Sequence, residues 1–188
     1  ADRFYRQLAT RPGPWQDIAA QEVWLAVRNG TPPKRSVVCR ASRGRPNLDG
    51  VLADPCWEQA SEMRLKSSQR LSIDGAAGFA LVSCDARFLY LGARMERAAA
   101  SSPTPVTTRS FDSDHTGFDR LTIFLDTDRD YQLGYELTID ERGQVSERCG
   151  RDPAWNPRCH VAIDSDDAAW RLEIAIPWTE LAVGRPAP

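Results

Sequence analysis

The feature of this 188-residue sequence that most limits its fold is a series of short segments in which apolar and polar residues alternate. In residues 119–126, leucine or isoleucine occupies every second position, and the same period runs through residues 131–139 and 169–176. A period of two places the apolar side chains on one face of a β-strand and the polar side chains on the other. The first two segments are therefore predicted to be amphipathic strands with one buried and one wet face. In the third, predicted to be a strand as well, Trp170, Leu172, Ile174 and Ile176 share one face.

Further short segments, bounded by turn residues, are also typical of strands. They are residues 35–41, 79–84, 87–96 and 160–163. Asp85 and Ala86 separate two of these segments, a spacing that suits a hairpin. Because no long helical pattern lies between the strands, the sequence predicts an all-β fold, an antiparallel β-sandwich.

The N-terminal residues have a different pattern. Apolar residues recur at helical intervals in residues 15–28, and Asn29-Gly30 then ends the helix. We therefore predict a partly helical N-terminal extension, residues 1–47, followed by the sandwich domain, residues 48–188.

The net charge of −2 hides an uneven distribution. Residues 1–47 contain nine Lys/Arg and three Asp/Glu, whereas residues 48–188 contain fifteen and twenty-three. The acidic main domain would repel phosphate backbones, so we expect no nucleic-acid partner. The basic extension could contact an acidic partner or a membrane surface, or it could pack on its own acidic domain.

No segment has the roughly 18 apolar residues that a transmembrane helix needs, and no signal-peptide pattern opens the chain. The chain begins with Ala1 and ends in a Gly- and Pro-containing segment. We therefore interpret it as a mature protein or as a fragment excised from a larger one.

The five cysteines do not have the paired short spacings of a zinc site. Cys149 and Cys159 enclose a segment rich in glycine and proline, which suits an irregular loop that a disulfide could join. We predict a disulfide between these two cysteines, with two separate buried thiols as the alternative.

Four fragments occur in the sequence in the same order as in a known family of domains. They are Leu48-Asp49-Gly50-Val51 followed by Trp57-Glu58-Gln59-Ala60, then residues 85–91, then residues 118–128, and finally residues 170–178. Together they resemble the pattern of family 9 carbohydrate-binding modules and of the wider DOMON-like β-sandwiches. The resemblance implies a non-catalytic domain that binds an oligo- or polysaccharide, forms part of a larger chain, and is secreted, periplasmic or in the cell envelope.

The resemblance implies that aromatic side chains grip the sugar ring while polar groups satisfy its hydroxyls, as the apolar C–H faces of a pyranose require. Trp155 lies between prolines in a predicted loop, where binding residues are common. The predicted sugar-binding residues are Trp155, Asn156, Tyr131 and Arg129, with Phe111 and Phe118 as further aromatic candidates. The alternative for Trp155 is a side chain that closes the end of the sandwich.

An acidic alternation follows one predicted strand, at Asp126, Asp128 and Asp130. Carboxylates at this spacing can converge on calcium, and the resemblance implies a structural calcium ion. The alternative is a solvated turn that protects a sheet edge.

Other functions find less support in the sequence. A DOMON-like domain could hold haem through Met95 with His160 or His115, but a buried methionine is more often core filler, and we expect no haem. The sequence contains neither a Gly-x-Ser-x-Gly nucleophile motif nor a glycine-rich phosphate loop, so we expect a binding module and not an enzyme. An interaction domain without sugar binding is a further alternative.

Overall fold

The computed structural model describes residues 2–33, 36–65, 78–97, 112–127, 134–150, 152 and 154–181. The chain divides into two compact units, Ala1–Val38 and Cys39–Pro188. Residues 39–47, which the sequence placed in the extension, are thus part of the second unit in the structure. None of the helices in the described part of the chain is long and apolar enough to cross a membrane.

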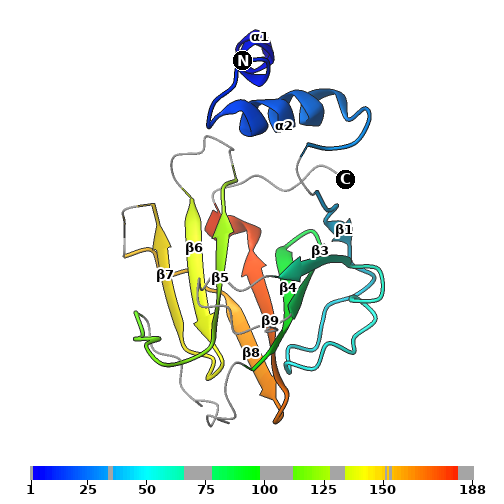
Figure 1. Cartoon of the computed structure of the whole chain (residues 1–188). Coiled ribbons are helices and arrows are strands. Elements are labelled where there is room, and N and C mark those ends of the chain that lie inside the picture. Colours follow the sequence, from blue (N-terminus) through cyan, green and yellow to red (C-terminus); the bar gives the residue numbers. More distant parts are fainter. Residues whose placement is uncertain are drawn as a thin grey trace. The chain divides into compact units, whose positions relative to one another are not determined.

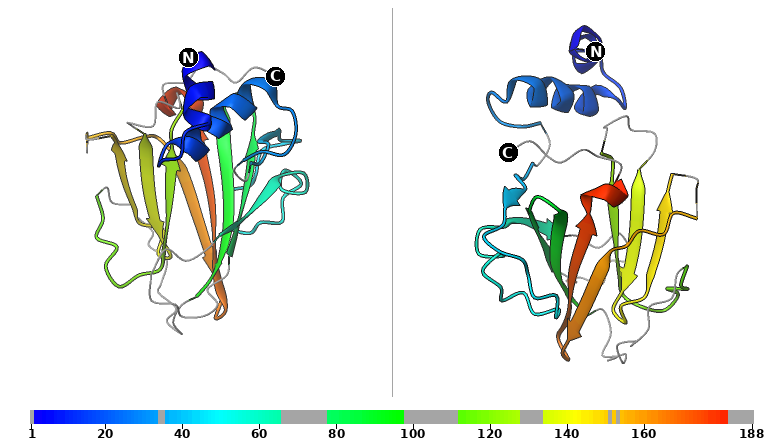
Figure 2. Two further views of the ribbon diagram at one scale, coloured as in Figure 1. Left: turned by 45° about the horizontal axis from the view of Figure 1, so that its top comes forward. Right: turned by 180° about the vertical axis from the view of Figure 1, so that it is seen from behind.

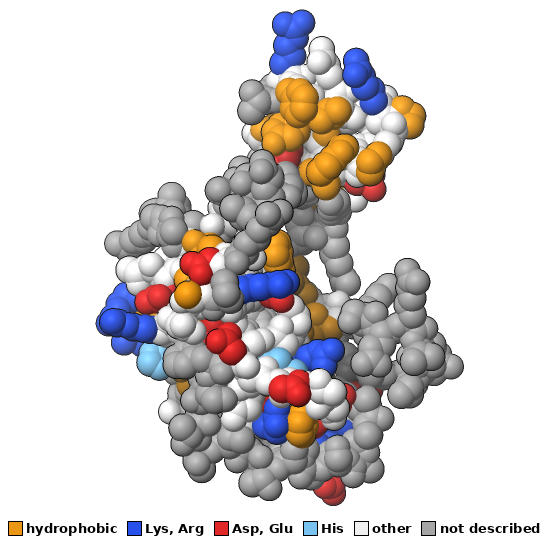
Figure 3. Space-filling view, turned by 90° about the vertical axis from the view of Figure 1, so that its left-hand side faces the viewer, with side chains coloured by type: hydrophobic (Ala, Val, Ile, Leu, Met, Phe, Trp, Pro, Cys, Tyr) orange, Lys and Arg blue, Asp and Glu red, His pale blue; other side chains and the backbone are white. Residues whose placement is uncertain are grey.

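The N-terminal unit contains two helices, α1 (Asp2–Ala9) and α2 (Gln16–Val27). Helix α2 ends where Arg28 adopts a left-handed conformation and its backbone N–H bonds to the carbonyl of Trp24. The sequence therefore predicted this helix to within a residue at each end. Hydrophobic side chains gather on the surface of this unit (Figure 3). Phe4 is 61% exposed and Trp15 is 56% exposed.

The second unit contains two β-sheets (Figures 1 and 2). Sheet A has the strand order β1-β3-β4-β9-β8, and β2 also pairs with β3. Its strands are β1 (Arg40–Ala41), β2 (Ser61–Leu65), β3 (Gly78–Cys84), β4 (Phe88–Glu96), β8 (His160–Ser165) and β9 (Ala169–Pro177). Sheet B has the order β5-β6-β7, formed by β5 (Arg120–Leu125), β6 (Tyr135–Asp140) and β7 (Val145–Cys149). The short 3₁₀ helix η1 (Trp178–Leu181) follows β9.

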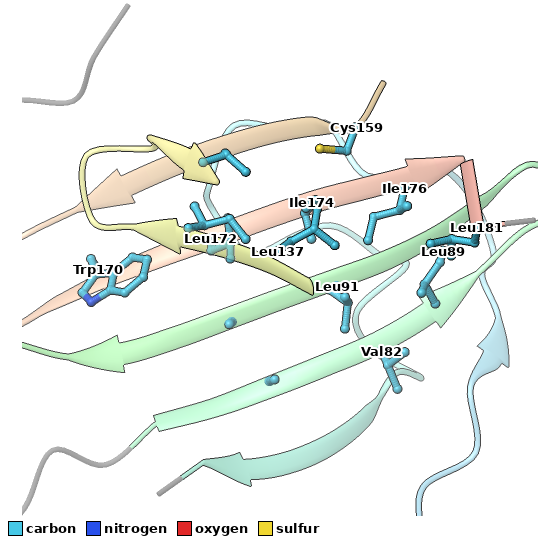
Figure 4. Close-up of a cluster of buried hydrophobic side chains, with 14 residues drawn as sticks. Val82, Leu89, Leu91, Leu137, Cys159, Trp170, Leu172, Ile174, Ile176 and Leu181 are labelled. Atoms are coloured by element: carbon cyan, nitrogen blue, oxygen red, sulfur yellow. The ribbon is translucent and has the colours of Figure 1, made fainter. Parts of the chain in front are cut away.

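Every strand pair is antiparallel except β1 with β3, which is parallel. The inner faces of the two sheets pack through one apolar cluster (Figure 4), in which Leu172 and Ile174 of β9 meet Leu137 of β6, all three fully buried. Burying one such side chain contributes about 1.5–3 kcal/mol. The predicted antiparallel sandwich is confirmed.

A second apolar cluster covers the other face of sheet A. It contains Trp57 and Cys56, which meet Tyr90 of β4 and Ala175 of β9. The segment from residue 48 to residue 60 therefore lies over sheet A, and β9 is buried on both of its faces.

The buried carboxylate of Glu173 holds this segment in place. One carboxylate oxygen accepts hydrogen bonds from the backbone N–H groups of Asp49 (3.0 Å) and Gly50 (2.8 Å). The other oxygen accepts one from the indole N–H of Trp57 (2.8 Å). Burial raises the pKa of Glu173, against the opposing effect of these hydrogen bonds.

Gly50 is required where it approaches sheet A. Its φ is +83°, and a Cβ at this position would lie 2.3 Å from the backbone nitrogen of Asp164. Only glycine tolerates both the backbone conformation and the close approach. Asp49, Gly50 and Trp57 therefore occur together because all three donate hydrogen bonds to the buried Glu173 carboxylate on β9.

We predict that Glu173→Gln lowers the free energy of unfolding by about 1–3 kcal/mol, because the amide nitrogen of glutamine would face at least one N–H donor. Urea denaturation measures the change. The exposed Glu62 on β2 provides a matched control, since Glu62→Gln should leave stability within about 0.5 kcal/mol of the parent. Equal effects of the two substitutions would show that Glu173 does not hold the segment.

Candidate functional site

The face of sheet B that points away from the core is lined by polar side chains and one aromatic ring. The strand register aligns Thr122 with Thr138 and Ser146 in one row, and Phe124 with Glu136 and Arg148 in the next. We call these six residues the sheet B outer face. Their inward neighbours on β5 are the apolar residues of the core, so the predicted alternation of this strand is confirmed.

Phe124 is the most exposed aromatic side chain among the described residues of the sandwich unit, at 62%. Its ring lies against Gly134, where a Cβ would come within 2.5 Å of the Phe124 Cζ atom. The glycine therefore leaves room for the ring to lie close to the backbone. The result is an apolar surface that is supported from below and open to solvent.

Charged and hydroxyl groups lie in the same two rows. Arg148 donates a hydrogen bond from Nη2 to Glu136 Oε2 at 2.6 Å, and the hydroxyls of Thr122 and Thr138 are 3.0 Å apart. The side chain of Arg148 is 59% exposed, so this ion pair adds little to stability. Its effect is to fix the direction of a donor and an acceptor on the sheet B outer face.

His115 connects the segment before β5 to this face. Its Nδ1 lies 3.0 Å from Asp140 Oδ2, and its Nε2 lies 3.0 Å from Ser146 Oγ. His115 and Asp140 are both buried. The imidazole therefore fastens the backbone around residue 115 beside the sheet B outer face.

Arg142 completes this network. It donates to Asp140 Oδ2 from Nε (3.0 Å) and from Nη2 (2.6 Å), and its guanidinium lies 3.5 Å from the centre of the Phe118 ring. Burial by itself would raise the pKa of Asp140, but hydrogen bonds from Arg142 and His115 outweigh it and lower that pKa. Because Arg142 covers one face of the Phe118 ring, that face cannot stack on a sugar.

Trp155 lies at one end of the core. Its ring centre is 4.8 Å from that of Tyr135, its indole N–H donates to the carbonyl of Glu180 at 3.3 Å, and it packs against the main apolar cluster. Asn156 donates only to the nearby carbonyl of Ala154 among the described residues. This arrangement favours the end-closing alternative for Trp155, and its sugar-binding role stays a prediction.

Several predicted site residues lie outside the described residues. They are Arg129, Tyr131 and Phe111 of the sugar site, and Asp128 and Asp130 of the calcium site. Asp126 directly follows β5. No group of three His, Cys, Asp or Glu that could hold a metal ion occurs within the described ranges. The calcium site therefore stays a prediction.

The predicted disulfide is wrong, because the structure contains Cys149 and Cys159 as thiols. Cys149 ends β7 of sheet B, and its backbone pairs with Asp152 in an isolated bridge. The Cys159 side chain is buried in the apolar core next to sheet A. The alternative of two separate thiols therefore holds, although only Cys159 is buried and Cys149 is half-buried.

The residues considered for haem ligation are not brought together around one space. Met95 pairs with Trp170 at the start of β9, whereas His160 pairs with Ala175 near its end. Both ring nitrogens of His115 already lie within hydrogen-bonding distance of protein oxygens.

Phe124 was missed by the sequence reasoning, although a signal for it was present. Because Leu121, Ile123 and Leu125 point inward, the period of two places Phe124 on the solvent face. A large aromatic residue at an outward position of an amphipathic strand is the kind of exposed apolar group that marks binding surfaces.

We predict that Asp140→Asn costs about 2–4 kcal/mol of stability at neutral pH, since the amide leaves Arg142 poorly paired. A lowered folded-state pKa means that the ionised Asp140 stabilises the fold above the unfolded value of about 3.9 and loses this effect as pH falls below it. The difference in free energy of unfolding between Asp140→Asn and the parent should therefore become smaller below about pH 4.

Urea denaturation at pH 3 and pH 7 measures this dependence. The exposed Asp167 serves as a control, and Asp167→Asn should leave the free energy of unfolding at pH 7 within about 0.5 kcal/mol of the parent. If Asp140→Asn lowers the free energy of unfolding equally at both pH values, the hydrogen bonds of Asp140 with Arg142 and His115 do not have the stabilising effect assigned to them.

We predict that Trp155→Ala lowers the free energy of unfolding by about 3 kcal/mol, because a large ring is removed from the end of the core. Equilibrium denaturation measures the loss. A loss below about 1 kcal/mol would mean that the Trp155 indole is not part of the core. It would then again be a candidate for stacking on a sugar.

No protein-family model and no curated protein matches this sequence. Among solved structures, the chain is similar to a carbohydrate binding module family 9 (CBM9) from Caldicellulosiruptor kristjanssonii in complex with cellotriose. The identity is 18%, the TM-score is 0.51, and the match covers 79% of this chain and 69% of that one. A CBM9 from the same organism in complex with glucose matches at 17% identity and a TM-score of 0.50, over 79% and 70% of the two chains. The chain therefore has the fold of a family 9 carbohydrate-binding module.

Proposed function

We propose that this chain is a non-catalytic carbohydrate-binding domain that binds a sugar on the sheet B outer face. The observation that carries the proposal is the 62% exposed Phe124 ring lying in the same row as Glu136 and Arg148. An apolar surface beside fixed hydrogen-bonding groups is what a pyranose requires, since its C–H face is apolar and its edge carries hydroxyls.

The groups around Phe124 supply both kinds of hydrogen-bonding partner. Glu136 accepts from sugar hydroxyls, Arg148 donates to them, and the exposed Thr122 can do either. Hydrogen bonds to charged groups are stronger than neutral ones, at about 1.5–3 kcal/mol. The side chains of Glu136 and Arg148 also orient each other, so less freedom is lost when the ligand binds.

The solved structures with this fold support the same ligand class. Those two proteins were solved in complex with cellotriose and with glucose. We therefore propose glucose-containing oligosaccharides as the first ligands to test. We also retain the proposal that the domain belongs to a larger secreted, periplasmic or cell-envelope protein.

The loop site at Trp155 and Asn156 is the second candidate location. Trp155 is only partly buried. Its contacts with Tyr135 and Glu180, however, hold it as a cover over the core. The sheet B outer face has the more exposed aromatic ring and the greater number of oriented polar groups.

We predict that Phe124→Ala weakens cellotriose binding by about 1–3 kcal/mol, which is roughly 5- to 150-fold in Kd, with little loss of stability. Isothermal titration calorimetry measures the affinity. Phe4→Ala is a matched control, because Phe4 in α1 is 61% exposed and lies in the other unit. That variant should bind as the parent does.

Two outcomes would overturn the proposal. Unchanged affinity of Phe124→Ala would move the site away from the sheet B outer face. A parent protein that binds neither cellotriose nor other gluco-oligosaccharides at millimolar concentration would favour the interaction-domain alternative.

A further inference from the structure

Two cysteines that are distant in the sequence meet at one edge of sheet A. Strand β1 pairs in parallel with the last two residues of β3, so that Arg40 faces Ser83 and Ala41 faces Cys84. Cys39 directly precedes β1. The backbone N–H of Ser42 donates to the carbonyl of Cys84 at 2.7 Å, which fixes the chain on the other side of β1.

The side chains of the two cysteines are neighbours. Cys84 Sγ lies 3.7 Å from the carbonyl oxygen of Arg40, the residue next to Cys39. Partial desolvation and, after it, the neighbouring Cys84 thiol raise the pKa of Cys39, so the two thiols interact. Cys39 is exposed and Cys84 is half-buried, so a small reagent can reach the pair.

The other cysteines differ from this pair. Cys56 and Cys159 are buried in separate apolar clusters, and Cys149 ends β7 in the other sheet. The pair at β1 and β3 therefore differs from them, because β-strand pairing brings these two accessible thiols to one sheet edge.

We propose that Cys39 and Cys84 form a disulfide that fastens β1 to sheet A when the protein meets a disulfide oxidant. β1 is two residues long and is paired on one side only, so a covalent link would strengthen its attachment. Cys39 is also the first residue of the sandwich unit, so the link lies where the helical unit is joined to it. The proposal is independent of sugar binding.

The chemistry requires a small-molecule disulfide such as oxidised glutathione as the oxidant. The Cys84 thiolate attacks one sulfur of oxidised glutathione, the S–S bond breaks, and one glutathione leaves as a thiolate. Cys39 then loses its proton to solvent and attacks Cys84 Sγ, which releases the second glutathione. Two protein thiols are oxidised, and one small-molecule disulfide is reduced to two thiols.

The order of attack follows from the environment of Cys39. Desolvation and the neighbouring Cys84 thiol raise the pKa of Cys39 to about 12, so its thiol stays protonated at neutral pH. Cys39 is therefore the weaker nucleophile at neutral pH and acts second, as the resolving thiol.

The test uses the full chain incubated with oxidised glutathione at pH 8, followed by alkylation and non-reducing peptide mapping. We expect one cross-linked peptide pair that contains Cys39 and Cys84, while Cys149 and Cys159 are recovered alkylated. The melting temperature should rise by about 5 °C or more, because the link closes a loop of about 45 residues in the unfolded chain.

Matched variants separate the pair from general oxidation. Cys39→Ser should abolish both the cross-link and the rise in melting temperature, whereas Cys149→Ser should retain both. Recovery of Cys39 and Cys84 as alkylated thiols would overturn the proposal. So would a stable glutathione adduct on Cys84 in the parent protein, since it would show that Cys39 cannot reach that sulfur.

Discussion

The three hydrogen bonds that Glu173 accepts determine which surfaces of this sandwich remain open. They bind residues 48–60 over sheet A, so the central strand β9 is covered on both faces. The inner faces of the two sheets cover each other. On the sheet B outer face, Thr122, Phe124 and Arg148 are exposed, whereas Thr138 between them is buried. The exposed part of this face is where we propose that the ligand binds.

Two buried carboxylates show how partner chemistry decides the effect of burial. Glu173 is held by neutral N–H donors, and burial prevails, so its pKa is raised. Asp140 has the guanidinium of Arg142 as a partner and accepts two backbone N–H groups as well, and its pKa is lowered. The first carboxylate holds a covering segment, and the second holds His115 beside the proposed site, so both act by fixing position.

The strands were readable from the sequence because alternation is a local signal, and β5 follows it with exposed and half-buried residues in turn. Strands β6 and β9 form where the alternation predicts them, but they are buried on both faces over most of their length, which the alternation does not predict. The sequence also showed the Asp49-Gly50 fragment that resembles the family pattern. It did not show why these residues are needed, because the hydrogen-bond acceptor, Glu173, lies more than a hundred residues away. The predicted disulfide failed because closeness in sequence says nothing about side-chain direction, and Cys159 points into the core. Cys39 and Cys84 are brought together by the pairing of β1 with β3, which the sequence does not reveal. Phe124 could have been predicted, because the alternation of β5 places it on the outward face, but the sequence analysis favoured the loop residue Trp155.

The most direct test is a cellotriose titration of the isotopically labelled protein, followed by amide chemical shifts. If the sheet B outer face is the binding site, the largest shifts should fall on Thr122, Phe124 and Thr138 and on their neighbours in β5 and β6. Amides around Trp155 and in α1 and α2 should move little. Shifts confined to residues 154–157, or no shifts at millimolar cellotriose, would contradict the proposed site.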